Sequence, residues 1–367
     1  MPSSVTLEKG AALVYRVFDI AEEIDLAAVE RLLGEKGPTS RLKLERAHRA
    51  FVIRNAPVTL SLGETTLRLG KTRRTLSMVA RLWDYGILSV QFHLPLPPDL
   101  DWTSLVALAA EIEGDNEFDT VARSTVSELL VALGPALRLP HEWEGMEDYT
   151  IYFIEKFSGA DSPRALLDIV NVPALILGEP TERLSRPVRE NILDSTLQYG
   201  EGDMAVIDWN SALVIEPGGS RDVPDVLEFA VTHLMEFRYY DDLLDRRLNT
   251  IYEAMARRPR RRLFMGPLPH ISHEASSRFI EFSEFIERVE NSLKVVGDFY
   301  LATVFRAATR RFRLGEWEAS ITRKMNLLAR VTDLLQGEVN VQRSHWLEII
   351  VIALIAFEIV SAILKIY

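Results

Sequence analysis

Ionisable side chains recur at helical spacing in the segment RYYDDLLDRR. Arg238, Asp241, Asp242, Asp245 and Arg246 fall within three turns of a helix. Asp241 lies on a line of apolar residues, where a lone carboxylate is costly unless it is paired. One interpretation is a metal or acid–base site built from these carboxylates. The other, which we favour, is that Asp241 pairs with an arginine of a neighbouring helix or subunit and so fixes register, as buried polar residues do in coiled coils.

A second candidate is the basic stretch RRPRRRLFMGPLP, which joins a cluster of arginines to an apolar run. The arginines are Arg257, Arg258, Arg260, Arg261 and Arg262, and the apolar residues that follow are Leu263, Phe264 and Met265. Arginines beside apolar residues favour a membrane surface, with the arginines at anionic lipid headgroups and the apolar side chains inserted. Two alternatives stay open, namely contact with RNA phosphates and a solvated loop whose charge balances the acidic remainder.

Other motifs fail the spacing that their chemistry requires. Gly70-Lys71-Thr72 resembles the end of a P-loop, but six residues instead of four separate Gly63 from Gly70. His270 and His273 could share a zinc ion, but no third ligand cluster is visible. The sequence Asp208-Trp209-Asn210 predicts a hairpin turn rather than a site. We therefore predict no catalytic residue, no metal site, no cofactor and no small-molecule substrate.

The composition is that of an ordinary globular protein with room for two domains. The chain has 367 residues and a formal net charge of -11, which argues against nucleic-acid binding by the surface as a whole. It has no cysteine, which excludes disulfides and suits a reducing compartment. The N-terminus lacks the cationic start and apolar core of a signal peptide.

Strand and helix patterns mix over residues 1–220 without the regular alternation of a Rossmann sheet. Apolar residues alternate in Val58 to Leu69 around Gly63-Glu64, which predicts a hairpin turning at Gly63. The segment from Asp148 to Phe157 predicts a further strand. We expect residues 1–220 to form an α+β domain with a mostly antiparallel sheet.

From Val223 onward the apolar spacing changes to that of a heptad. Three runs keep this spacing, at residues 223–255, 279–307 and 321–346. The third run keeps its phase into Trp346, which predicts one helix of about 50 residues. We expect residues 221–345 to form long antiparallel helices packed like a coiled coil.

The last 22 residues, Trp346 to Tyr367, are almost entirely apolar. A helix of this length spans about 30 Å, so we predict a C-terminal transmembrane anchor. Arg330 and Arg343 precede it, which would keep the bulk of the chain in the cytoplasm. Glu358 would lie inside the apolar layer, where a carboxylate usually faces another helix, is protonated or lines a polar path; our hypothesis is a contact with another helix of an oligomer. The alternative is a buried helix of a soluble bundle.

Two segments resemble a known family. One covers residues 310–360, with KMNLL beginning at Lys324 and the run HWLEIIVIALIAFEIV, and the other is LEFAVTHLMEFRYYDDLLDRRL. They resemble the mitochondrial "required for meiotic nuclear division" family and its bacterial relatives, which also place acidic residues at the positions of Glu348 and Glu358. Trp346 precedes Leu347-Glu348 here, whereas the family has the order Leu-Glu-Trp.

The resemblance implies a membrane-anchored homo-oligomer. Mitochondrial members of that family support translation of membrane proteins at the inner membrane, and tethering of the ribosome is one way in which they could do so. No catalytic residue is assigned in that family, so none is carried over to this chain.

These observations lead to three hypotheses about function. The first is a non-enzymatic, oligomeric scaffold or tether at a membrane, facing the cytoplasm of a bacterium or the matrix of an organelle. The second is a membrane-tethered enzyme with an acidic site near Asp241 to Asp245. The third is a tether for RNA or the ribosome. A cluster of perturbed carboxylates in a pocket near the first long helix would favour the enzyme, and a flat repeated helical interface would favour the scaffold.

Overall fold

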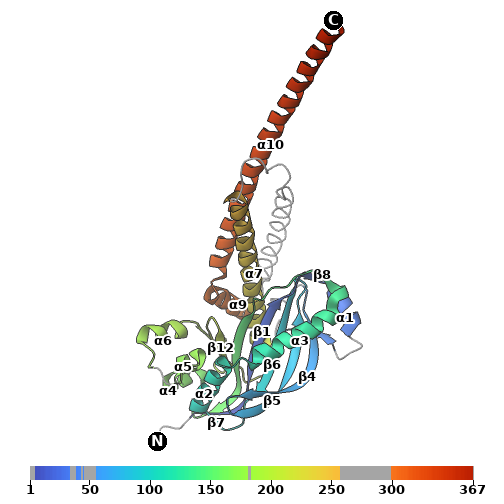
Figure 1. Cartoon of the computed structure of the whole chain (residues 1–367). Helices are drawn as coiled ribbons and strands as arrows, with labels where there is room; N and C mark the ends of the chain where they lie inside the picture. The colour runs from blue at the N-terminus through green and yellow to red at the C-terminus, as the bar shows by residue number, and fades with distance from the viewer. Residues whose placement is uncertain are drawn as a thin grey trace. The chain divides into compact units, whose positions relative to one another are not determined.

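The computed structural model describes residues 5–33, 39–42, 44, 55–180, 183–256 and 299–366. The chain divides into two compact units. Unit 1 comprises residues 1–239 and 288–317, and unit 2 comprises residues 240–287 and 318–367. The described chain is α+β, with a large mixed sheet in unit 1 (Figure 1).

Ten strands of unit 1 form this sheet among the described residues, in the order β10-β11-β12-β9-β1-β6-β5-β4-β3, with β7 beside β1. Neighbouring strands are antiparallel except β12 and β9, which are parallel. The strands are β1 (Thr6–Asp19), β3 (Thr39–Arg41), β4 (Val58–Leu69), β5 (Thr72–Leu82), β6 (Ile87–Pro95), β7 (Leu100–Asp101), β9 (Glu147–Ser158), β10 (Thr196–Leu197), β11 (Met204–Ile207) and β12 (Ser211–Ile215). A separate small sheet pairs β2 (Ala21–Ile24) with β8 (Leu137–Pro140).

The strands β4 and β5 form one long hairpin, which corrects the predicted turn at Gly63. β4 continues through a bulge between Ser61 and Gly63, and the chain turns at Gly70 instead. Both glycines have positive φ, +82° and +56°, a conformation that side chains disfavour. The bulge shifts the alternation of apolar residues by one position, and in the sequence this shift resembled a turn. The Gly70-Lys71-Thr72 triplet is therefore the tip of a hairpin.

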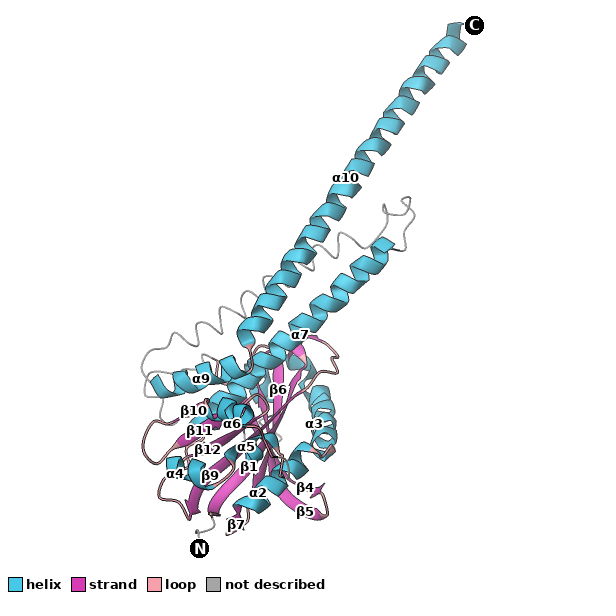
Figure 2. Ribbon diagram, turned by 90° about the vertical axis from the view of Figure 1, so that its left-hand side faces the viewer, coloured by secondary structure: helices cyan, strands magenta, loops and turns pink. Residues whose placement is uncertain are grey.

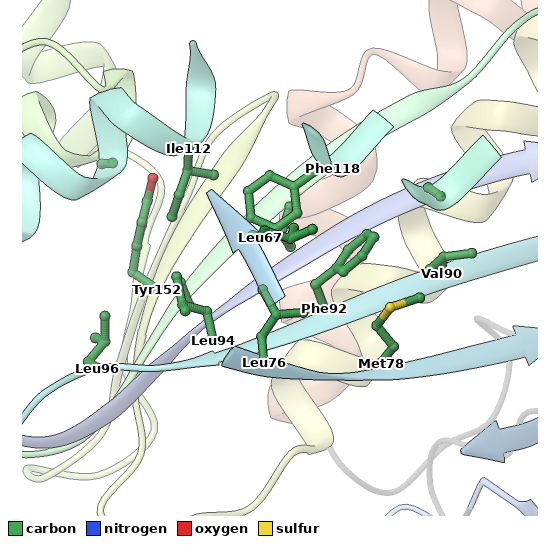
Figure 3. Packing of buried hydrophobic residues seen from close by; sticks show 14 of the residues in the cluster. Leu67, Leu76, Met78, Val90, Phe92, Leu94, Leu96, Ile112, Phe118 and Tyr152 are labelled. Atoms are coloured by element: carbon green, nitrogen blue, oxygen red, sulfur yellow. The ribbon is translucent and has the colours of Figure 1, made fainter. Parts of the chain in front are cut away.

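One face of the sheet carries the main hydrophobic core beneath α2 (Trp102–Glu113) and α3 (Glu117–Leu133). Figure 3 shows Phe92 of the sheet next to Phe118 of α3, and Met78 and Val90 belong to the same buried cluster. The rings of Phe92 and Phe118 meet edge to face, with centroids 5.1 Å apart. Burial of such large apolar side chains stabilises this layer by roughly 1.5–3 kcal/mol each.

Apart from the first half of α7, the remaining helices of unit 1 have at most 13 residues. They are α1 (Leu26–Leu33), a 3₁₀ turn (Gly134–Ala136), α4 (Pro163–Ile169), α5 (Val172–Leu177), α6 (Arg186–Leu193) and α9 (Phe299–Arg311). Figure 2 shows the helices in cyan and the strands in magenta. Ser162 and Asn171 cap α4 and α5 by accepting hydrogen bonds from backbone N–H groups, which satisfies donors at the helix starts.

The opposite face of the sheet packs against the first half of α7 (Asp222–Ala256) through a buried charged network. Nη1 of Arg81 lies 2.7 Å from Oδ1 of Asp225 and also pairs with Glu228, whose side chain is fully buried. Trp83 stacks on Phe229 with ring centroids 5.3 Å apart. Charges removed from water must be paired in good geometry, so the network specifies how α7 sits on the strands.

The turn between β5 and β6 depends on Gly86. Its φ is +93°, and an added Cβ would lie 1.7 Å from the carbonyl oxygen of Ala21. The same approach brings the backbone N–H of Ile20 to 3.0 Å from the Gly86 carbonyl oxygen, with which it forms a hydrogen bond. Only glycine fits a position with this φ and this close contact.

Unit 2 contains the end of α7 and most of α10 (Leu314–Ile366), a single helix of 53 residues, as the unbroken heptad phase predicts. Among the helices of the described residues, none is long and apolar enough to cross a membrane. This finding overturns the predicted transmembrane helix at residues 346–367. The apolar run is interrupted by Glu348 and Glu358, which are both exposed on the helix, and a charge within hydrocarbon costs several kcal/mol.

Candidate functional site

Unit 1 contains a cleft of about 960 Å³ in which charged and aromatic side chains meet. We call it the arginine cleft. Its walls come from the start of β9, from α6, from the β11–β12 turn, from α7 and from the turn between α9 and α10. The lining residues are Glu147, Asp148, Leu177, Pro187, Val188, Asn191, Ile192, Asp194, Ser195, Asp208, Trp209, Leu234, Arg238, Arg310, Arg311, Phe312, Arg313 and Trp317.

Tyr149 of β9 holds two of these walls in place from within the fold. Its buried hydroxyl lies 3.0 Å from the carbonyl oxygen of Asp208 and 3.1 Å from that of Ser211, so it donates to the β11–β12 turn. Its ring meets Phe312 edge to face at 5.5 Å. One side chain thus ties the hairpin turn and the α9–α10 turn to the same strand.

Arg311 joins the turn after α9 to both α6 and the β11–β12 turn. Its Nε lies 3.5 Å from Oδ1 of Asp208, and its Nη1 donates to Oδ1 of Asn191 at 2.8 Å. Burial raises the pKa of Asp208, and Arg311 partly offsets this effect. Because Arg311 is occupied by these partners, its role is to fix the shape of the cleft.

Glu147 and Arg238 form an ion pair at another side of the cleft. The side chain of Glu147 is only 10% exposed, whereas that of Arg238 is 44% exposed. Burial raises the pKa of Glu147 to about 7, although Arg238 lowers it. Solvent around the arginine screens its attraction, so the desolvation of the carboxylate prevails. Glu147 can therefore gain or lose a proton near neutral pH.

Two further arginines line the cleft, and neither forms a close ion pair with a carboxylate of the described residues. Arg310 is exposed, and no carboxylate of the described residues pairs with it. Arg313 lies 3.9 Å from Glu316, and both side chains are more than 70% exposed. Arg313 also has a φ of +55°, which is strained for a residue with a side chain. Such strain concentrates at functional sites.

Two tryptophans complete the cleft. Trp209 at the β11–β12 turn is 62% exposed, and Trp317 lies near the start of α10. Arginines next to flat aromatic surfaces can bind an anion that carries a planar group. The described residues contain no group of three or more side chains suited to hold a metal ion.

The predicted constellation around Asp241 is an ion-pair cluster of unit 2. Nζ of Lys324 in α10 lies 2.8 Å from Oδ1 of Asp241 and 2.7 Å from Oδ1 of Asp245. Asp242 pairs with Arg246 at 2.8 Å one turn along the same helix. The partner of Asp241 is thus a lysine of the neighbouring helix rather than the expected arginine. Lys324 thus pairs with the carboxylates of both Asp241 and Asp245. This pairing does not favour the acid–base interpretation.

The other predicted site residues are not brought together. Arg238 belongs to the arginine cleft, and Glu358 lies exposed on α10. The five arginines between 257 and 262 and the apolar residues 263–265 lie outside the described residues, as do His270 and His273. Predictions of contact with anionic lipid or RNA through that stretch stay predictions.

The sequence interpretation missed the arginine cleft, although its signals were present. Three arginines stand within four residues in the segment RRFR, which ends a helix, and Trp209 stands in a predicted turn. The turn itself is confirmed between β11 and β12. Glu147 gave no signal, because its burial depends on α7, which lies about 90 residues further along the chain.

Comparison with known proteins places the first part of this fold in a family. Residues 9–221 match the family described as "Uncharacterized protein MJ0711, N-terminal domain". The chain belongs to this family. The match takes in Glu147 and the β11–β12 turn of the cleft, whereas the MJ0711 N-terminal domain as matched ends before Arg238 and the RRFR segment.

A curated relative agrees with this assignment. The "Uncharacterized protein MJ0711" of Methanocaldococcus jannaschii is 22% identical over 222 residues, which cover 60% of this chain and 67% of the relative. No solved structure matches the chain. These matches do not bear on the resemblance to the "required for meiotic nuclear division" family, which stays a prediction.

Proposed function

We propose that unit 1 is a binding module whose arginine cleft takes a small anionic ligand. The observation that carries the proposal is Arg310, an exposed cation that lines a cleft and has no carboxylate partner among the described residues. Arg313 lines the same cleft with only a distant, exposed partner. An arginine presents a planar fork of donors that suits phosphate and carboxylate.

The surroundings of these two arginines support the same conclusion. Arg238 and Arg311 are already paired with Glu147 and Asp208, so their charge is largely balanced within the cleft. The two unbalanced cations are therefore the ones available to a ligand. The walls are held by Tyr149 and Arg311, which reduces the conformational entropy lost on binding.

Titration calorimetry of the full chain with inorganic phosphate and with pyrophosphate tests the proposal. Arg310→Gln removes one charge-assisted hydrogen bond of about 2 kcal/mol, so the Kd should rise roughly 30-fold. Arg306→Gln is the matched control, because Arg306 is exposed on the same helix and does not line the cleft. The control should keep its Kd within about twofold.

Two results would contradict the proposal. In the first, the unaltered chain binds neither anion at millimolar concentration. In the second, Arg310→Gln and Arg306→Gln weaken binding equally, which would mean that the anion responds to net charge and not to the cleft.

A second candidate function is the assembly scaffold, favoured by the apolar surface of α10. Seven large apolar side chains of its C-terminal part are between 49% and 74% exposed, which is far more than isolated surface residues provide. They are Leu347, Ile350, Val351, Ile352, Leu354, Ile355 and Phe357. We propose that this surface packs against α10 of a second copy.

Light scattering on the purified full chain tests the assembly. It should have the mass of a multimer, and Leu354→Asp with Phe357→Asp should lower that mass to a monomer. Leu327→Asp is the control, because Leu327 is an exposed apolar residue of α10 that lies about seven turns before Leu354. A monomeric full chain would refute the scaffold and leave the arginine cleft unaffected.

A further inference from the structure

The arginine cleft exposes an aromatic surface as well as charge. Trp209 lies at the tip of the β11–β12 turn and is 62% exposed. Tryptophan has a large apolar ring system, so at a cleft wall it offers a wide apolar face to a ligand. Trp317 lines the same cleft from another element. An indole presents a flat face on which a planar ring can stack.

We infer that the ligand of the cleft is a nucleoside phosphate, with its base stacked on Trp209 and its phosphate at Arg310 and Arg313. The inference rests on the proposed anion-binding function and names the class of ligand. A phosphate alone would use the arginines but leave the indole exposed. A nucleoside alone would use the indole but leave Arg310 without a counter-charge. A nucleoside phosphate satisfies both.

The fold fixes the indole relative to the arginines. Asp208 precedes Trp209 and pairs with Arg311, and Arg311 follows Arg310 in the chain. Tyr149 donates to the carbonyl oxygen of Asp208 on the other side of the same turn. The backbone at Trp209 is therefore held in place, because the preceding residue, Asp208, contacts Arg311 of the RRFR segment. Little rearrangement is needed for one small molecule to reach both groups.

The size of the cleft agrees with this class of ligand. A volume of about 960 Å³ lies near the upper end of the range of small-molecule pockets, which is roughly 300–1,000 Å³. This is room for a base, a sugar and phosphate together with water. The cleft is also lined by the carboxylates of Asp148 and Asp194, which form no ion pair among the described residues and disfavour a second strongly anionic group beside the first. We therefore expect a nucleoside monophosphate to bind at least as well as a triphosphate.

Titration calorimetry of the full chain with AMP, UMP, ribose 5-phosphate and adenosine separates the contributions. Both nucleotides should bind about tenfold more tightly than ribose 5-phosphate, a gain in the range that stacking of a base supplies. Trp209→Leu should abolish this difference while the affinity for ribose 5-phosphate stays the same. Tyr199→Leu is the control, since Tyr199 is 74% exposed in unit 1 and lies outside the cleft.

The outcomes distinguish this inference from the function on which it rests. Equal affinity for ribose 5-phosphate and the nucleotides, unchanged by Trp209→Leu, would overturn the nucleoside phosphate and leave the anion-binding cleft standing. Failure of every phosphate compound to bind would overturn both. Binding of adenosine as tight as that of AMP would remove the role of the arginines, and with it the inference.

Discussion

Replacement of Glu147 by glutamine should make the protein more stable at alkaline pH. The burial of Glu147 raises its pKa from 4.5 to about 7 despite the ion pair with Arg238. The folded protein thus holds this proton more tightly than the unfolded chain does. The stability contributed by the protonated form is fully present below about pH 4.5 and is lost as the pH rises through about 7.

The magnitude follows from the size of the rise in pKa. A rise of one unit in pKa corresponds to about 1.4 kcal/mol, so the ionised carboxylate costs the folded state about 3 kcal/mol at pH 8. Glutamine has nearly the shape of the protonated side chain and cannot ionise. Glu147→Gln should therefore raise the free energy of unfolding by about 3 kcal/mol at pH 8 and by less than about 1 kcal/mol at pH 5.

Urea unfolding of the unaltered chain and the variant at both pH values measures this difference. Glu142→Gln is the control, because Glu142 is exposed in the segment just before β9. It should change the free energy of unfolding by less than about 0.5 kcal/mol at either pH. A loss of stability in Glu147→Gln at pH 8 would refute the reasoning, because it would mean that the ion pair with Arg238 outweighs the desolvation of Glu147.

Three further changes test contacts within each unit, taken by itself. Arg81→Met should lower the free energy of unfolding by about 3–5 kcal/mol, since two buried carboxylates lose their partner. Adding Asp225→Asn and Glu228→Gln should restore most of the lost free energy of unfolding, which would identify charge as the cause. Lys324→Met should cost about 1–2 kcal/mol, because the largely buried Asp241 loses its ion pair; a double-mutant cycle with Asp241→Asn measures the coupling, and a coupling near zero would contradict it. Gly86→Ala should cost more than about 3 kcal/mol, because its Cβ would overlap the Ala21 carbonyl oxygen at a positive φ; an unchanged thermal midpoint would show that the turn rearranges freely.

The sequence predicted local structure where a short-range signal decided it. The strand from Asp148 to Phe157 and the hairpin turn at Asp208-Trp209-Asn210 are both found in the structure. The strand has its own run of apolar residues and the turn has its own turn residues, so no distant contact is needed to predict either of them. The predicted turn at Gly63 was wrong. A glycine at a break in the alternation of apolar residues along a strand can mark either a bulge or a hairpin turn, and Gly63 lies at a bulge.

The arginine cleft could not be predicted in the same way. Its opposing walls come from Glu147, Asp208, Arg238 and Arg311, which are brought together only when β12 pairs in parallel with β9 and when α7 and α9 pack against the sheet. Parallel pairing of distant strands leaves no local signature in sequence. The raised pKa of Glu147 depends on burial by those same elements. The carboxylates around Asp241 were more conspicuous in the sequence because they share one helix.

The most direct measurement is anomalous diffraction from crystals of the full chain soaked in tungstate, an electron-dense mimic of phosphate. The account predicts a tungsten peak in the arginine cleft, within hydrogen-bonding distance of Arg310 and Arg313, which is absent from crystals of Arg310→Gln. A tungsten peak that persists in Arg310→Gln crystals, or peaks found only on arginines outside the cleft, would contradict it.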